Sequence, residues 1–137
     1  MTAAATTRPL RILIADDHEL FAEGLAAILD AHAGLEVVGR AADGAEALAL
    51  ASTLRPDVIL MDVNMPSLDG ISATREIVAS GAETRVLMVS ASTGADVVSR
   101  ARAAGAAAYL FKGCPLRDML AAIRETVPAS SLAVQAA

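Results

Sequence analysis

Short apolar runs alternate with amphipathic stretches five times along this chain. The runs have the length of β-strands, and Val58-Ile59-Leu60-Met61 is apolar at every position, which is typical of a strand covered on both faces. The predicted strands cover residues 10–15, 35–41, 58–61, 85–89 and 108–111. Each strand is followed by one of the amphipathic stretches.

The amphipathic stretches carry apolar residues three or four positions apart, which places them on one face of a helix. The period is clearest in the last stretch, which begins at Pro115 and ends at Pro128. The residues expected to face inward are, helix by helix, Phe21, Leu25, Ile28 and Leu29; Ala47, Leu48 and Ala51; Ile71, Thr74, Ile77 and Val78; Val97, Val98, Ala101 and Ala104; and Leu116, Met119, Leu120, Ile123 and Val127.

Strict alternation of strand and helix predicts a parallel sheet with helices on both faces, because right-handed crossovers return each helix against the sheet. We predict an α/β fold, a doubly wound five-stranded parallel sheet of the flavodoxin-like (βα)5 type with strand order 2-1-3-4-5. A closed barrel needs roughly 250 residues, and 137 residues exclude it. We expect an extension over residues 1–9, one domain over 10–128 and a linker-like tail over 129–137.

Composition narrows the classes of partner. Sixteen acidic residues against 11 basic ones give a net charge of −5, and only three residues are aromatic. Binding to nucleic acid needs a basic surface and stacking rings, so we expect no DNA contact by this domain itself. The longest apolar stretch, residues 103–111, is too short to cross a membrane. A single cysteine, Cys114, and the lack of a signal-peptide pattern predict a cytoplasmic location.

Polar side chains follow four of the predicted strands, namely Asp16 and Asp17, Asp62, Ser90, and Lys112. In an open parallel sheet, ligands bind beyond the carboxyl ends of the strands, where the strand order reverses. Three carboxylates that meet there raise one another's pKa unless a cation lies among them. Mg²⁺ suits such oxygen ligands and bridges to phosphoryl oxygens. Lys112, the only lysine, would add a second positive charge, so the set predicts phosphoryl transfer.

Each of these residues also has a simpler interpretation. An Asp before a helix is most often an N-cap, although Asp16 and Asp17 cannot both fill one cap position. A serine after a strand commonly satisfies loop backbone, and a lysine is commonly a solvated charge. His18 fits a metal ligand or a base, but with no second histidine nearby a first-turn helix residue is the preferred interpretation. Only the joint placement of the polar residues favours a site.

The chain resembles a response-regulator receiver domain of two-component signalling, from about Leu10 to Val127. The resemblance is carried by Asp16-Asp17, Asp62-Val63-Asn64-Met65-Pro66, Asp69-Gly70, Ser90-Ala91 and Lys112. Many receivers have proline directly after the lysine, whereas this chain has Lys112-Gly113-Cys114-Pro115. Together with the opening over residues 11–18, that difference is more similar to receivers that precede a helix-turn-helix output domain.

The resemblance implies a role for each matching residue. Asp62 would be the phosphoacceptor, and Asp16 and Asp17 would hold Mg²⁺ together with Asp62 and the backbone carbonyl of Asn64. Lys112 would pair with the phosphoryl group. The remaining implied roles are switching for Ser90 and Tyr109 and modulation of dephosphorylation for Asn64 and Ser92.

The resemblance also implies partners. These are a sensor histidine kinase, a second copy of the chain after phosphorylation, and DNA only through a C-terminal output domain absent from this chain. The domain would catalyse its own Mg²⁺-dependent phosphorylation and slow dephosphorylation without being an enzyme in the ordinary sense.

Two other functions compete with this switch. A small aspartyl-phosphate phosphohydrolase is one, because Asp62-Val63-Asn64 partly resembles the Asp-x-Asp motif of haloacid-dehalogenase-like enzymes. That motif has a second Asp where Asn64 stands, and those enzymes carry a capping insertion that 137 residues do not hold. The other is a phosphate-independent interaction module with a vestigial acidic pocket, against which the intact polar set argues.

Overall fold

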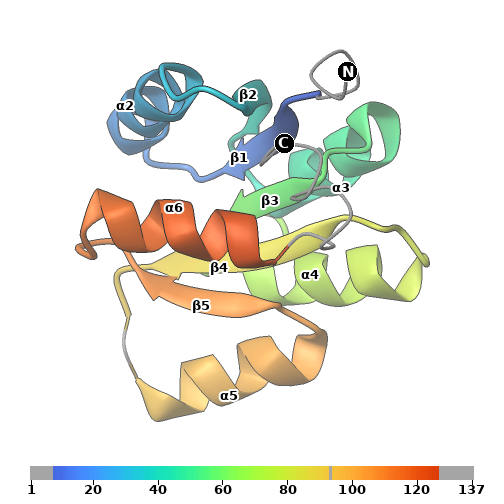
Figure 1. Ribbon diagram of the computed structural model, residues 1–137. Coiled ribbons are helices and arrows are strands. Elements are labelled where there is room, and N and C mark those ends of the chain that lie inside the picture. Colours follow the sequence, from blue (N-terminus) through green and yellow to red (C-terminus); the bar gives the residue numbers. More distant parts are fainter. Residues whose placement is uncertain (1–7, 93, 127–137) are drawn as a thin grey trace.

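Five parallel strands form one sheet in the order β2-β1-β3-β4-β5, as predicted (Figure 1). The computed structural model describes residues 8–92 and 94–126. The strands are β1 (Leu10–Ala15), β2 (Leu35–Ala41), β3 (Val58–Met61), β4 (Arg85–Ser90) and β5 (Ala108–Phe111). The helices are α2 (Glu19–Asp30), α3 (Gly44–Leu54), α4 (Gly70–Ala79), α5 (Ala95–Ala104) and α6 (Leu116–Glu125).

The sheet is buried on both faces because successive strand residues point to opposite sides. In β1, Ile12 and Ile14 pack into the core beneath α2 and α6, whereas Leu13 packs beneath the other helices. All three side chains are at most 1% exposed. Helices α2 and α6 therefore cover one face, and α3, α4 and α5 cover the other. No helix among the described residues is long and apolar enough to cross a membrane.

Three side chains of the predicted inward stripes are more exposed than expected. Ile28 and Val78 are each 45% exposed and Leu116 is 38% exposed. Ile28 lies at the edge of a stripe whose centre, formed by Leu25 and Leu29, fills the core. Leu116 is the first residue of α6, where the helix has just left the loop. The predicted Val127 and Pro128 lie outside the described residues.

Backbone hydrogen bonds of the sheet continue one residue past the ends of three strands. The amide of Asp16 donates to Ala41 at 2.9 Å, that of Asp62 to Ala15 at 2.8 Å, and that of Lys112 to Ser90 at 2.8 Å. The polar residues that follow the strands are thus held by the sheet itself. Their side chains start from a rigid frame at one edge of the molecule.

Two glycines let loops approach closely at this edge. The amide of Gly70 donates to the carbonyl of Val63 at 2.8 Å, which closes the loop between β3 and α4. A Cβ atom at Gly70 would overlap the carbonyl of Asp62, and one at Gly44 would overlap the carbonyl of Leu68. Glycine is required at these two positions by space.

We predict that Gly70→Ala lowers the free energy of unfolding by about 1–3 kcal/mol, because the backbone at Asp62 must shift to admit the methyl group. Gly24→Ala is the matched control, since Gly24 lies inside α2 with nothing within 4 Å of an added Cβ. The control is expected to gain about 0.5–1 kcal/mol from helix propensity. Urea unfolding measures both changes. Equal effects of the two substitutions would contradict the close approach at Gly70.

Candidate functional site

The ends of four strands bring the predicted polar residues to one crevice. Asp16 follows β1, Asp62 follows β3, Ser90 ends β4, and Lys112 follows β5. Asp16 is 5% exposed, Asp62 3% and Ser90 0%. Asp17, which lies beside them, keeps 37% of its side chain exposed and forms the rim. The sheet therefore buries two carboxyl groups next to each other.

Four side chains converge tightly enough to share one cation. One ligand atom each from Asp16, Asp17, His18 and Asp62 lies within 4.8 Å of the other three. Three of the four are carboxylates, the oxygen ligands that hard cations such as Mg²⁺ and Ca²⁺ prefer. The cluster fits a divalent cation both in its donor atoms and in its excess of negative charge.

Lys112 contacts this cluster from β5. Its Nζ lies 2.8 Å from Asp16 Oδ2 and 3.6 Å from Asp62 Oδ2, so Asp16 is its closer partner. The ammonium also lies 4.6 Å from the centre of the Phe21 ring, within range of a cation–π contact. The Lys112 side chain is only 14% exposed. Lys112 is thus held between an acidic residue and an aromatic ring at the mouth of the crevice.

Asp62 has the most perturbed environment of the cluster. Burial, followed by the neighbouring charge of Asp16, raises the pKa of Asp62 to about 6, although Lys112 and His18 act in the opposite direction. Within the described residues, the Oδ2 atom of Asp62 is the buried side-chain oxygen that finds no hydrogen-bond partner. A desolvated carboxylate oxygen without a donor is available to an incoming electrophile or cation.

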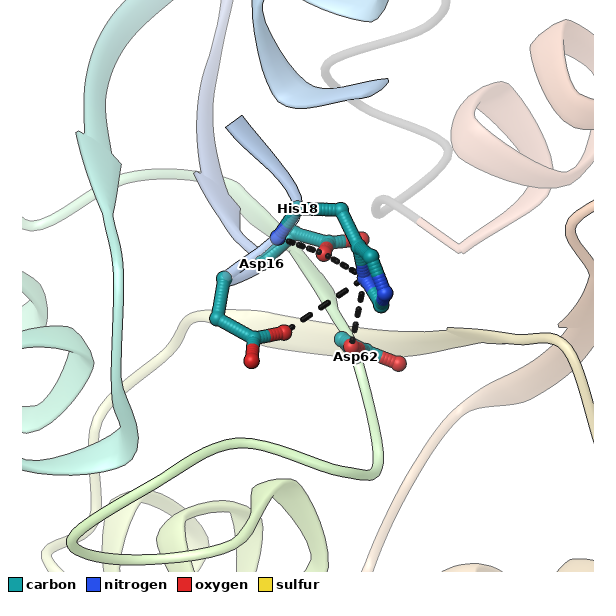
Figure 2. Close-up of side chains that lie close together, drawn as sticks. Asp16, His18 and Asp62 are labelled. Atoms are coloured by element: carbon teal, nitrogen blue, oxygen red, sulfur yellow. Dashed lines mark hydrogen bonds and ion pairs between the residues drawn. The ribbon is translucent and has the colours of Figure 1, made fainter. Parts of the chain in front are cut away.

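His18 lies where the sequence interpretation did not place it. It is the N-cap residue of α2, one residue before the first turn, and its side chain makes no capping hydrogen bond. The ring turns instead toward the carboxylates (Figure 2). Its Nδ1 atom is 3.0 Å from Asp16, 3.4 Å from Asp17 and 3.8 Å from Asp62. The preferred interpretation, a first-turn helix residue, thus misses the position by one residue and does not include these contacts.

A second group of contacts joins Ser90 to Tyr109 through one residue. The amide of Ser92 donates to Ser90 Oγ at 3.0 Å, and the hydroxyl of Tyr109 donates to the carbonyl of Ser92 at 2.7 Å. Tyr109 is half-buried on β5. The two residues with predicted switching roles thus share a partner in the loop between β4 and α5.

Asn64 is exposed, two residues after Asp62, and its predicted carbonyl contact to a cation stays a prediction. Sequence reasoning assigned Phe21 only to the core stripe of α2 and missed its contact with Lys112. An aromatic residue four positions after the acid pair is the signal that was available. The position of this aromatic residue predicts a contact with Lys112 only when α2 and the end of β5 are known to be neighbours.

The raised pKa of Asp62 predicts how stability changes with pH in metal-free protein. Since the folded state raises this pKa, stability is full below the unfolded value near 4 and falls as pH rises through about 6. In EDTA at pH 8, the free energy of unfolding of Asp62→Asn is expected to exceed that of the parent by about 3 kcal/mol. This difference is expected to vanish toward pH 4. Urea unfolding across this pH range is the measurement.

The matched control for this prediction is Asp57→Asn, at the other end of β3. Although burial opposes it, hydrogen bonds from Arg8 and Arg11 hold the pKa of Asp57 below its usual range. Asp57 therefore contributes stability above its unfolded pKa, and its substitution is expected to destabilise at pH 8 and less so at acidic pH. A higher free energy of unfolding at pH 8 in both variants, or in neither, would contradict the electrostatic account.

Comparison with known proteins agrees with the geometry. A family model described as the response regulator receiver domain matches residues 12–124. Response regulator GacA of Pseudomonas aeruginosa is 40% identical over 85% of this chain and 54% of its own length. Transcriptional regulatory protein LiaR of Bacillus subtilis is 41% identical over 84% of this chain and 54% of its length. The chain thus spans about half the length of these curated relatives.

A solved structure shares both the fold and part of the sequence. It is a two-component response regulator of the LuxR family from Aurantimonas sp. SI85-9A1, 32% identical, with a TM-score of 0.81. The match covers 86% of this chain and 84% of that one. The resemblance seen in the sequence is confirmed, and the chain belongs to the response regulator receiver domain family.

Proposed function

We propose that this chain is a phosphorylation switch in which Asp62 accepts a phosphoryl group from the histidine of a sensor histidine kinase. The observation that carries the proposal is the buried Asp62 Oδ2 atom without a hydrogen-bond partner, 3.6 Å from the ammonium of Lys112. A nucleophile left free beside a cation is the arrangement that phosphoryl transfer requires. Membership in the receiver family supports the same function.

The transfer exchanges one bond for another. A carboxylate oxygen of Asp62 forms a bond to phosphorus as the bond between phosphorus and the kinase imidazole breaks, and the imidazole keeps the electron pair. Asp62 reacts as the carboxylate, which is its main form above a pKa of about 6. Charge on the phosphoryl oxygens is the principal quantity that the site must then neutralise.

Mg²⁺ is the cation we assign to this reaction, held by Asp16, Asp17, Asp62 and the backbone carbonyl of Asn64. Their oxygen atoms fit its preference, and Asp16 and Asp62 are already buried side by side. When bound, it would neutralise negative charge shared by the carboxylates and the phosphoryl group. Lys112 adds a second positive charge from β5, since its ammonium already lies between Asp16 and Asp62.

The signal would leave the site through Ser90. Its hydroxyl oxygen accepts from the Ser92 amide, so its own proton is free to be donated to a phosphoryl oxygen. A shift of Ser90 toward Asp62 would draw the backbone N–H of Ser92 with it, and the carbonyl of the same residue accepts from Tyr109. Phosphorylation would thereby change the surface made by α5, β5 and α6.

The output is the regulation of transcription. LiaR is named a transcriptional regulatory protein, and the LuxR-family structure is named a two-component response regulator. We infer that this domain controls a C-terminal helix-turn-helix domain that contacts DNA, through a homodimer formed on phosphorylation, in the cytoplasm. An acidic chain with a net charge of −5 is unsuited to hold DNA by itself.

We predict that acetyl phosphate with Mg²⁺ adds one phosphoryl group to the chain, detected by intact mass. Asp62→Asn is expected to abolish the label because it removes the nucleophile, and EDTA is expected to reduce it strongly. Asp57→Asn, the matched carboxylate at the opposite end of β3, is expected to label like the parent. Labelling of Asp62→Asn would reject Asp62 as acceptor, and rapid turnover of a generic phosphomonoester would favour a phosphohydrolase.

We further predict that Ser90→Ala retains most of the phosphoryl label but weakens self-association of the phosphorylated protein, because the link to the Ser92 peptide is lost. Tyr109→Phe, which removes only the hydroxyl bonded to Ser92, is expected to alter association more than labelling. Analytical ultracentrifugation with and without beryllofluoride measures the association. Parent-like responses from both variants would reject the route through Ser92.

A further inference from the structure

We propose that His18 supplies a nitrogen ligand to the cation site and so increases its preference for first-row transition metals over Mg²⁺. The inference rests on the cation site of the proposed function and adds a ligand to it. It predicts that Ni²⁺ or Zn²⁺ is held by the imidazole together with the carboxylates of Asp16, Asp17 and Asp62. Figure 2 shows the His18 ring beside Asp16 and Asp62.

The spacing of the donor atoms is close to that of a coordination sphere. Ligand atoms about 2.1 Å from an octahedral ion lie about 3.0 Å apart when adjacent and about 4.2 Å apart when opposite. Nδ1 of His18 lies 3.0, 3.4 and 3.8 Å from oxygens of Asp16, Asp17 and Asp62. The first distance equals the adjacent value, and the other two lie between the adjacent and the opposite values. Small movements of the side chains would therefore bring the imidazole nitrogen and the carboxylate oxygens onto one ion.

Hydrogen bonding alone leaves this group of atoms incompletely satisfied. Lys112 Nζ lies 3.1 Å from His18 Nδ1, and an ammonium can only donate, so that contact needs a bare ring nitrogen. A bare nitrogen cannot also donate to Asp16, 3.0 Å away. Independently, Asp62 Oδ2 is buried and has no hydrogen-bond partner. A metal ion would take the one lone pair of Nδ1 in place of the Lys112 ammonium and would also bind the unpartnered Oδ2 of Asp62.

The His18 ring is positioned by these polar contacts more than by packing. Its side chain is 65% exposed and makes no cap to α2. Its backbone amide, however, donates to Asp16 Oδ1 at 2.8 Å, which fixes the residue over the crevice. An exposed ring anchored in this way can adjust to an incoming ion without disturbing the core.

The type of ligand determines which ions bind more tightly. Imidazole suits Ni²⁺, Zn²⁺ and Cu²⁺, whereas Mg²⁺ favours carboxylate, carbonyl and water oxygens. A site of carboxylates alone already follows the general affinity order of divalent metals. The contribution of His18 is therefore the amount by which its removal reduces the difference in binding affinity between Ni²⁺ and Mg²⁺. The size of that difference in the parent is not the test.

Calorimetric titration of the whole chain with NiCl₂ and with MgCl₂ tests the proposal. His18→Gln is expected to weaken Ni²⁺ binding at least about tenfold, in line with losses at metal sites, and to weaken Mg²⁺ binding far less. His32→Gln is the matched control, because His32 is the other histidine and bonds the carbonyl of Ile28 within α2. It is expected to match the parent for both ions.

A second measurement identifies the ligand directly. In ¹⁵N-resolved imidazole spectra of the parent, ZnCl₂ is expected to shift the ring nitrogens of His18 and leave those of His32 unchanged. A shift of neither ring would overturn the proposal. So would equal losses of Ni²⁺ and Mg²⁺ affinity in His18→Gln, or a gain in Mg²⁺ affinity, which would make the ring a competitor for the cation.

Phosphorylation separates this inference from the proposed function. If the parent labels on Asp62 with Mg²⁺ while His18→Gln leaves the Ni²⁺ affinity unchanged, the switch stands and the ligand role of His18 falls. If the His18 effect on Ni²⁺ appears but Asp62 does not label, the ligand role stands and the phosphorylation proposal falls.

Discussion

The rest of the site depends on one electrostatic constraint, the burial of the Asp62 carboxyl beside that of Asp16. Each is at most 5% exposed, and the first has a pKa raised to about 6. Two neighbouring carboxylates out of water are tolerated only when positive charge or donors are supplied. Lys112 supplies part of this positive charge from the end of β5. Its ammonium lies 2.8 Å from Asp16 and 3.6 Å from Asp62. In the proposed function, a divalent cation would supply the remaining positive charge.

The sheet makes this energetically unfavourable arrangement possible because core packing and ladder hydrogen bonds hold its strands in place. Both faces are filled by fully buried side chains such as Ile12 and Leu13, and the ladder hydrogen bonds continue to the amides of Asp16, Asp62 and Lys112. A carboxylate attached to such a frame cannot move into solvent by a small backbone shift. Hydrophobic burial across the sheet therefore offsets the electrostatic cost at one edge, and that edge stays reactive.

Sequence reasoning located the strands and the site because both depend on local order along the chain. Strand ends at Asp16, Asp62 and Lys112 meet in any parallel sheet with this strand order, so their convergence followed from topology. The positions of His18 and the contact of Phe21 with Lys112 depend instead on rotamers and on distances between α2 and β5. Periodicity carries no information about either. The exposure of Ile28 and Val78 shows the same limit. An apolar stripe defines which face of a helix is buried, but not how much of that face the neighbouring elements cover.

In the proposed switch, the link between Ser90 and Tyr109 would limit how far phosphorylation alone drives the change of conformation. Among the described residues, the two are joined through Ser92, which donates its backbone N–H to Ser90 and accepts from Tyr109 at its carbonyl. A neutral hydrogen bond contributes about 1 kcal/mol net, and a bond to a charged phosphoryl oxygen about 1.5–3 kcal/mol. Reversing a 1:99 population to 99:1 needs about 5.5 kcal/mol of differential stabilisation. The contacts inside the domain therefore supply only part of this energy. In the proposed function, association at the surface of α5, β5 and α6 would supply the remainder and would tie the phosphorylated conformation to the presence of a partner.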